Sequence, residues 1–505
     1  MIKLIYRIES DYMSKKRMLI VTSVTLSVVT ISLGIVKLYQ TYALSNYIGT
    51  VTDTGIDVYI NDDSYASIPA NGSSNVYYML TNTNPGTVKY GVAYQTTSGV
   101  TVKVYDTSED PATGTIEEND KKYIKLHLEN KNSTNKTIEL STVLGYENGG
   151  DLVVPSGVTL VTDTYTPPPT AAEYITKLYT TASKTTVTNN SITYNTAPSV
   201  SLMNDRLGGT TTDLDGGNIR YYGASPNNYI YFNCSDYSNQ TSSTCETWRI
   251  IGVFNGKLKI IRGSQIGTYS WDNKDTSTGA ESNFGKNDWT TARLMKLLNP
   301  SDYYTTDSND NNLGQGLYYN SASGKCYSGQ NNATVDCNFT STGIKNDITR
   351  NMIAETTYNL GGWNTNKIYS NQIYEYERGT TVYTGRPTTP WTGKIALAYP
   401  SDYGYAADLN QCKDKILKDY DNSTCTSNNW MKAIITNNGS SLGWLLTPDS
   451  SYSHSVWSVY SSGYVIYRSA YNVIGVVPVL SLSSKLGIEP GSGDGSSSNP
   501  YKLSA

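Results

Sequence analysis

The sequence predicts three structural parts: an N-terminal transmembrane helix, an all-β sandwich, and a C-terminal α+β domain. Three observations support this. An uncharged apolar run lies near the N-terminus, short segments of alternating apolar and polar residues follow it, and strand-like and helical segments are mixed in the second half. The 505 residues are enough for about three domains. Lys and Arg number 39 against 43 Asp and Glu, so no basic excess points to nucleic acid as a partner.

The apolar run MLIVTSVTLSVVTISLGIV occupies residues 18–36. As a helix it would span about 28 Å, close to the roughly 30 Å hydrocarbon core of a bilayer. Basic residues gather before it and only Lys37 follows closely; those before it are Lys3, Arg7, Lys15, Lys16 and Arg17. The positive-inside rule predicts a cytoplasmic basic segment (1–17), a transmembrane signal-anchor (18–38), and a single-pass protein of the cell membrane whose C-terminal bulk is extracellular.

A cleaved signal peptide is the alternative. Thr41-Tyr42-Ala43 offers a weak small-x-small site, with cleavage after Ala43. The apolar run is longer than the usual signal-peptide core, which favours the anchor. Both interpretations place the rest of the chain outside the cell.

Residues 50–163 are predicted to form an Ig-like β-sandwich. Strand-like segments separated by turn residues are expected at 55–60, 75–80, 88–94, 100–105, 123–128, 137–144 and 158–161. In the segment 123–128, Ile124, Leu126 and Leu128 share one face. His127 falls on the other face, so it is expected to point to solvent.

Residues 164–217 are predicted as a Pro-rich linker followed by a helix. Three consecutive prolines in 166–170 favour a stiff, extended connection. Thr170 and Glu173 then match a capping box that opens a helix reaching about Thr181.

Residues 218–482 carry the pattern of the α+β domain. Strands are expected at 229–232, 248–254, 257–262, 394–399, 456–460, 463–467 and 476–482, with Asn255-Gly256 as a hairpin turn. Helices are expected from about 287 to 298, ended by Asn299-Pro300, and from 343 to 355. The Gly/Ser-rich tail, 483–505, is expected to be flexible, with its last residues, 501–503, closing against a sheet edge.

The cysteines form three local groups of two. Disulfides are predicted between Cys234 and Cys245, Cys326 and Cys337, and Cys412 and Cys425. Metal binding or a redox pair would require closer spacings such as C-x-x-C, which do not occur. The alternative to these disulfides is six free thiols in a reducing compartment.

Six segments in a fixed order resemble a family of uncharacterised bacterial surface proteins with a C-type-lectin-like domain, the fold also found in formylglycine-generating enzymes, here preceded by an Ig-like sandwich. The segments are NIRYYGASPNNYIYFN (218–233), WRIIGVFNGKLKIIRGSQIGTYSWDN (248–273), DWTTARLMKLLN (288–299), GKIALAYPSDYGYA (393–406), WLLTPDSS (444–451) and VWSVYSSGYVIYRSAYNVIGVVPVLSL (456–482). The resemblance implies a C-type-lectin-like domain at 218–482.

The chain also departs from that family. Leu446 and Val477 stand where the family's W-L-R-S-P and G-V-R-P motifs carry arginine, and the calcium-binding sugar motifs of true C-type lectins are missing. Formylglycine-generating chemistry needs reactive cysteines, whereas all six here are predicted to be paired. With only two histidines, His127 and His454, no Ser-His-Asp arrangement is expected. The sequence therefore predicts neither an enzyme nor a cofactor or metal.

One stretch of about twenty residues has the composition of a recognition surface. Tyrosine is crowded there together with Ser, Gly and Asn, a mixture typical of binding loops. The candidate ligand-binding residues are Tyr452, His454, Tyr460, Tyr464, Tyr467, Arg468 and Tyr471. Trp457 lies among them and is expected to be structural. The predicted partners are the membrane and a glycan or surface-protein ligand; an architectural envelope protein and an enzyme of the formylglycine-generating-like fold are the alternatives.

Overall fold

The computed structural model describes residues 44–52, 55–57, 65–82, 86–146, 152, 154–207, 213–274, 283–305, 313–379, 381–383, 386–387, 390–439, 441–489 and 491–504. The expected segments 1–17 and 18–38 lie outside these residues, as does the alternative cleavage site at Ala43. Within the described ranges, no helix is both long and apolar enough to span a membrane. The described chain is mostly β-sheet.

The chain divides into two compact units, which we call unit 1 (residues 1–167) and unit 2 (residues 168–505). The division falls between Pro167 and Pro168, inside the proline-rich segment. Each unit has its own hydrophobic core.

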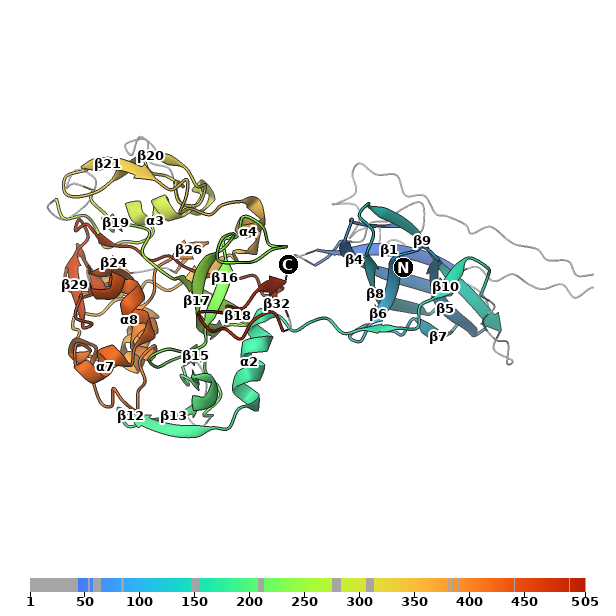
Figure 1. Cartoon of the computed structure of the whole chain (residues 1–505), viewed down its shortest axis with the longest axis horizontal. Helices are drawn as coiled ribbons and strands as arrows, with labels where there is room; N and C mark the ends of the chain where they lie inside the picture. Colours follow the sequence, from blue (N-terminus) through green and yellow to red (C-terminus); the bar gives the residue numbers. More distant parts are fainter. Residues whose placement is uncertain are drawn as a thin grey trace, which may run out of the picture. The chain divides into compact units, whose positions relative to one another are not determined.

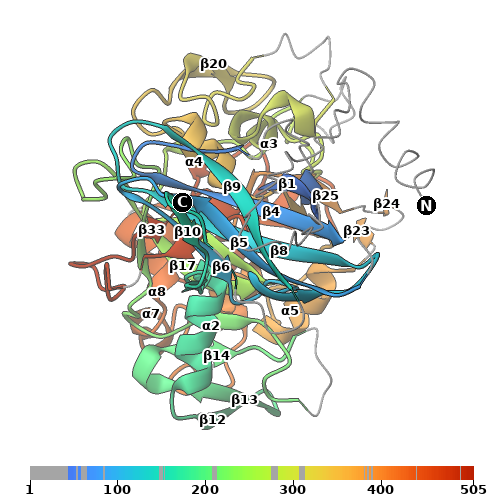
Figure 2. The same ribbon diagram turned by 90° about the vertical axis from the view of Figure 1, so that its right-hand side faces the viewer.

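Unit 1 contains two β-sheets among its described residues (Figures 1 and 2). One sheet has the strand order β11-β6-β8-β4-β1-β2, and the other has the order β10-β5-β9-β3 with β7 paired to β5. The strands are β1 (Leu44–Thr52), β2 (Gly55–Asp57), β3 (Tyr65–Ile68), β4 (Gly72–Asn82), β5 (Val88–Gln95), β6 (Val100–Tyr105), β7 (Thr113–Ile116), β8 (Lys121–Asn130), β9 (Lys136–Tyr146), β10 (Val158–Leu160) and β11 (Thr164–Tyr165).

Alternation builds the core of unit 1, because every second side chain of a strand points to the same face. In β8, Ile124, Leu126 and Leu128 are fully buried, as predicted. They pack with alternate residues of β4, such as Val76 and Tyr78.

The expectation for His127 is wrong, because its side chain is only 5% exposed. Strand β11 pairs in parallel with β6 at the edge of the same sheet, and its residue Tyr165 lays its ring over the face on which His127 lies. The His127 ring stacks on Tyr165 with centroids 3.6 Å apart, and Nδ1 lies 2.7 Å from Oδ1 of Asn75. Burial lowers the pKa of this imidazole, although Glu129 opposes the shift.

Unit 2 is built around two larger sheets. The nine-stranded sheet has the order β12-β13-β14-β15-β17-β18-β31-β26 with β16 paired to β17, and the five-stranded sheet has the order β19-β30-β27-β28-β29. Their strands are β12 (Thr185–Asn189), β13 (Ile192–Ala197), β14 (Leu202–Asn204), β15 (Ile219–Tyr221), β16 (Tyr229–Phe232), β17 (Glu246–Phe254), β18 (Lys257–Arg262), β19 (Thr268–Tyr269), β26 (Ile395–Ala396), β27 (Gly443–Pro448), β28 (Ser455–Val459), β29 (Val465–Ser469), β30 (Ile474–Gly475) and β31 (Val479–Ser481).

Small two-stranded sheets and short helices complete the described part of unit 2. The two-stranded pairs are β20 (Ser323–Tyr327) with β21 (Thr334–Asn338), β22 (Thr356–Tyr358) with β25 (Trp391–Gly393), β23 (Thr381–Tyr383) with β24 (Arg386–Pro387), and β32 (Gly487–Ile488) with β33 (Leu503–Ser504). The α-helices are α2 (Ala171–Thr181), α3 (Arg293–Leu298), α4 (Asp347–Met352), α5 (Ser370–Glu377), α6 (Pro400–Tyr405), α7 (Ser423–Ser427) and α8 (Trp430–Ile435).

The segment 164–217 is more than the predicted linker and helix. Helix α2 begins with the expected capping box, in which Thr170 and Glu173 bond reciprocally. Beyond it, β12, β13 and β14 join the nine-stranded sheet, and Figure 2 shows β12 and β13 beyond one end of α2. These strands are rich in Thr and Asn, so they lack the apolar alternation by which a strand is recognised in a sequence.

The tail of unit 2 is packed rather than flexible. Tyr501 lies against β16, because its N–H donates to Tyr229 O and its carbonyl accepts from Tyr231 N, each at 2.9 Å. This confirms that residues 501–503 close against a strand. Strand β33 pairs with β32, and Gly487 of β32 also bridges to Thr170, just before α2.

All six cysteines form the three predicted disulfides, Cys234–Cys245, Cys326–Cys337 and Cys412–Cys425. Each disulfide closes a local loop of unit 2, and both of its cysteines are buried. The third loop contributes directly to the surface described next.

Candidate ligand-binding surface

The predicted recognition stretch folds into a hairpin of strands β28 and β29. The two strands are antiparallel, with Trp457 opposite Tyr467 and Val459 opposite Val465. At the turn, Tyr460 N donates to Tyr464 O and Gly463 N donates to Tyr460 O, both at 2.8 Å. β29 begins two residues later than expected, because residues 460–464 form this turn.

Gly463 is required at the turn by its conformation and by its neighbours. Its φ of +116° lies in a region that side chains disfavour. A Cβ at this position would lie 2.8 Å from Cγ2 of Thr426 and 3.0 Å from the carbonyl oxygen of Tyr420. The turn therefore packs closely against the loop closed by the Cys412–Cys425 disulfide.

Trp457 anchors the hairpin in the core, as predicted. Its side chain is fully buried, and Nε1 donates to the carbonyl oxygen of Trp363 at 3.2 Å. Val459 and Val465 are buried beside it. These buried side chains hold one face of the hairpin in the core, whereas parts of β29 and the turn are exposed to solvent.

Tyr464, Tyr467 and Arg468 line one open hollow of about 530 Å³. Tyr460 adjoins this group, because its ring stacks on Tyr464 with centroids 4.9 Å apart and lies 5.8 Å from the Arg468 guanidinium. Tyr467 is 37% exposed. The hollow lies within the volume range of small-ligand pockets.

The other three candidates gather elsewhere, around Phe284. Ring centroids lie 5.1 Å apart for Phe284 and His454, 5.4 Å for Phe284 and Tyr471, and 5.9 Å for Tyr452 and His454. None of these residues lines the hollow. The structure therefore splits the seven candidates into two groups.

Three residues of the hollow have no local signal in the sequence. Asn366 precedes α5, and Lys418 and Asp421 belong to the disulfide-closed loop 412–425. Asn366 links the two sides, since Nδ2 donates to Val465 O at 2.6 Å and its carbonyl accepts from Lys418 N at 3.0 Å. Lys418 lies in the short 3-10 turn η5 (Leu417–Asp419), which Leu417 fixes through its buried side chain.

A second hollow, of about 370 Å³, lies between α2, β15 and the C-terminal tail. Tyr174, Tyr221 and Tyr501 contribute its rings. Tyr221 and Tyr501 are almost fully buried, so only Tyr174 presents substantial ring surface. Tyr174 therefore serves below as a control for the first hollow.

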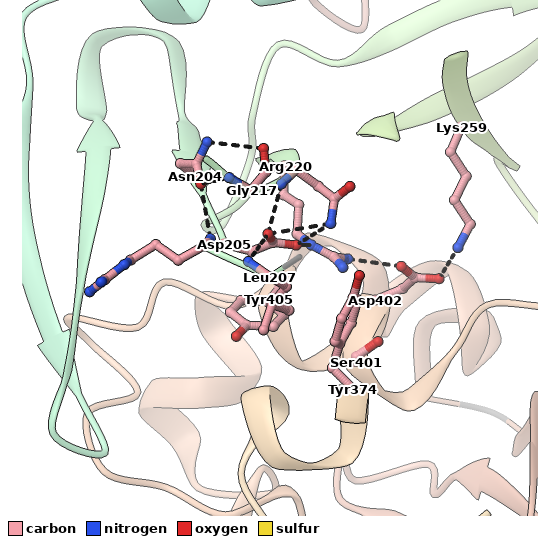
Figure 3. Close-up of polar contacts among 12 residues, drawn as sticks. Asn204, Asp205, Leu207, Gly217, Arg220, Lys259, Tyr374, Ser401, Asp402 and Tyr405 are labelled. Atoms are coloured by element: carbon pink, nitrogen blue, oxygen red, sulfur yellow. Dashed lines mark hydrogen bonds and ion pairs between the residues drawn. The ribbon is translucent and has the colours of Figure 1, made fainter. Parts of the chain in front are cut away.

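Buried charges form a separate cluster, shown in Figure 3. Arg220 bonds to Asp205 and to Asp402, with 2.9 Å between its Nη1 and Oδ1 of Asp402, and Lys259 bonds to the other oxygen of Asp402. Asp402 also accepts from Tyr399 N at 3.0 Å, which caps α6. Burial opposes ionisation of Asp402, but Lys259 and Arg220 outweigh it and hold the pKa of this carboxyl below its usual range.

This cluster has the character of a structural link. Its two cations are matched by its two carboxylates, and it joins β15, β18 and the residue that follows β14 to α6. A buried ion pair keeps its stability only while both partners are present. We therefore place the candidate ligand site at the hollow beside β29.

Glu377 lies near the same helix and is fully buried. Its carboxylate accepts from Ser401 N at 2.9 Å and Ser401 Oγ at 2.6 Å, and Nη1 of Arg378 lies 3.1 Å away. Burial nevertheless raises the pKa of Glu377 to about 7.

No group of three or more residues able to hold a metal ion occurs among the described positions. No protein-family model matches this chain, and no curated protein does so either. Fold and surface together define a β-rich, disulfide-bonded protein of two units.

Proposed function

We propose that this chain is a membrane-anchored extracellular recognition or adhesion protein. An Ig-like unit 1 would support a C-type-lectin-like unit 2, which binds a glycan or a protein ligand. The observation that carries the proposal is the hollow beside β29, where aromatic rings, two cations and polar groups converge on an outward-facing surface. Aromatic surface with adaptable polar neighbours is the usual material of recognition sites.

Two further observations support recognition over the alternatives. All six cysteines are paired, which leaves no thiol for chemistry of the formylglycine-generating type. The hairpin is rigid beneath the hollow, because Trp457 and Gly463 fix it. Rigid support for an exposed aromatic surface favours binding over a purely architectural role.

The test is an array of glycans and surface proteins probed with the full chain, purified in a mild detergent. We expect saturable binding that Tyr464→Ala combined with Tyr467→Ala weakens at least tenfold, since buried aromatic contacts dominate binding energy. Tyr174→Ala, which removes a tyrosine from the second hollow, is the matched control and should bind normally. The assay is repeated with EDTA, where unchanged binding is expected.

Circular dichroism would first show that both variants are folded. Equal binding by the double variant and the wild type would show that the ligand binds elsewhere than in this hollow. Binding of nothing on the array by a folded, oxidised sample would favour the architectural role, and loss of binding in EDTA would show that a metal ion takes part.

A further inference from the structure

Strand β29 leaves one long edge uncovered by another strand. It is the last strand of the five-stranded sheet in the part of unit 2 that the structure describes, and it pairs with β28 on one side. Edge strands present backbone donors and acceptors that can pair with a further strand.

The hydrogen-bond pattern shows which backbone groups face outward. Tyr460 N donates to Tyr464 O, and Ala470 N donates to His454 O at 2.7 Å. In an antiparallel ladder such bonded pairs recur at every second residue. Ile466 and Arg468 therefore turn their backbone groups toward β28. Val465, Tyr467 and Ser469 turn theirs away from it.

At both ends of this outward edge the backbone carbonyl already accepts a hydrogen bond. Val465 O accepts from Asn366 Nδ2 at 2.6 Å, and Ser469 O accepts from Asn472 N at 2.9 Å. Between them, the N–H and C=O of Tyr467 have no hydrogen-bond partner among the described residues. Tyr467 is thus the residue of this edge whose backbone donor and acceptor are both available to a further strand.

The hollow of about 530 Å³ lies along this open edge. Successive side chains of a strand point to opposite faces, so Tyr467 and its neighbours Ile466 and Arg468 lie on different faces of β29. All three line the hollow, which must therefore border the edge itself. Asn366 and the disulfide-closed loop form its far side.

The charges around the hollow are unbalanced. Lys418 and Arg468 are positive and Asp421 is negative, and in the described part of the chain no ion pair involves any of the three. An acidic group entering the hollow would meet two cations and one carboxylate. The hollow thus favours an anionic ligand.

We propose that the hollow binds an extended, acidic segment of a partner protein, which adds to β29 as a further strand. One residue of that segment exchanges two hydrogen bonds with Tyr467. The acidic side chain of a neighbouring residue of the segment, which points to the same face as Arg468, lies between Lys418 and Arg468. An extended peptide supplies an N–H and a C=O on one edge of the same residue, the complement of what Tyr467 offers. The proposal rests on the function proposed above and specifies its ligand class.

The probe is a display library of short random peptides, selected against the full chain. We expect enriched sequences to carry Asp or Glu at a fixed position within an extended, β-branched context. The tightest peptide is then synthesised with each backbone amide N-methylated in turn. Methylation at one position should weaken binding about tenfold, because a single backbone hydrogen bond is lost.

The matching protein variants are Tyr467→Pro and Tyr467→Thr. Both lose the aromatic ring, but only proline loses the outward N–H, and an edge strand tolerates proline at such a position. Tyr467→Pro should bind the peptide about tenfold more weakly than Tyr467→Thr. If Tyr467→Pro is unfolded by circular dichroism, the N-methyl series decides the question.

Each outcome separates this inference from the general function. Equal binding by all N-methylated peptides would overturn strand addition. No enriched peptide, together with a glycan that requires Tyr464 and Tyr467, would overturn the peptide ligand and leave the recognition function standing. Failure of both the library and the array would overturn both.

Discussion

Glu377 shows how a single buried residue ties stability to pH. Its pKa in the folded protein, about 7, lies above the ordinary value of 4.5. Between these values the folded protein holds a proton that the unfolded chain has lost. The resulting stabilisation is complete below pH 4.5 and is lost as the pH rises through about 7.

Glu377→Gln should remove this pH dependence, because glutamine resembles the protonated acid. We expect the wild type to lose about 3 kcal/mol more than the variant in free energy of unfolding between about pH 4 and about pH 8. Denaturant unfolding of both proteins across that range measures the difference. Parallel profiles would mean that Glu377 is ionised throughout or is not buried in solution.

His127 shows what alternation cannot reveal about a residue. The pattern of β8 correctly separates Ile124, Leu126 and Leu128 from His127. It cannot show that Tyr165, 38 positions further along the chain, covers the second face. The sequence pattern of a polar strand face is the same whether that face is exposed to water or covered by an aromatic ring from a distant strand.

At the scale of elements, strong local signals gave good predictions. Strands β16 and β18 have the expected bounds, since each has an apolar pattern and Asn255-Gly256 marks the turn before β18. Strands β12 and β13 were missed because threonine and asparagine hide their pattern. Helix α3 is shorter than expected, because residues before Arg293 form turns.

The hollow itself was only half predictable. Tyr464, Tyr467 and Arg468 lie close together in the sequence, where their composition is visible. Asn366, Lys418 and Asp421 are brought opposite them by the bond from Asn366 to Val465 and by the Cys412–Cys425 loop. Such assembly depends on tertiary contacts and leaves no local pattern.

Because the loop 412–425 contributes to the hollow, we expect ligand binding to depend on the Cys412–Cys425 disulfide. Cys412→Ser combined with Cys425→Ser should weaken binding at the hollow at least tenfold, because Lys418 and Asp421 lose their fixed positions. Cys326→Ser with Cys337→Ser opens the β20–β21 hairpin, which does not line the hollow. Each pair should cost about 3 kcal/mol of stability in the chain-entropy model.

Binding of the array ligand and denaturant unfolding are measured for both double variants. Loss of stability in both, with loss of binding only in the first, is the expected result. Normal binding without the Cys412–Cys425 disulfide would show that the loop is held by its other contacts.

At the scale of the whole molecule, the division at Pro167 and Pro168 predicts that unit 2 folds by itself. Residues 168–505, produced in an oxidising compartment, should unfold in one cooperative transition and retain all three disulfides. Calorimetry and thiol titration test this. A chain that stays unfolded without residues 1–167 would show that the two units depend on each other.

The bridges at Gly487 bring the start of unit 2 close to residues near position 504. Thr170, at the start of unit 2, and Ser504, near its end, both pair with Gly487. A unit that enters and leaves at neighbouring points can be inserted into a surface loop of an unrelated host protein without stretching that loop. Unit 2 thus has the geometry of a transferable module, suited to fusion at either end or to insertion in the middle.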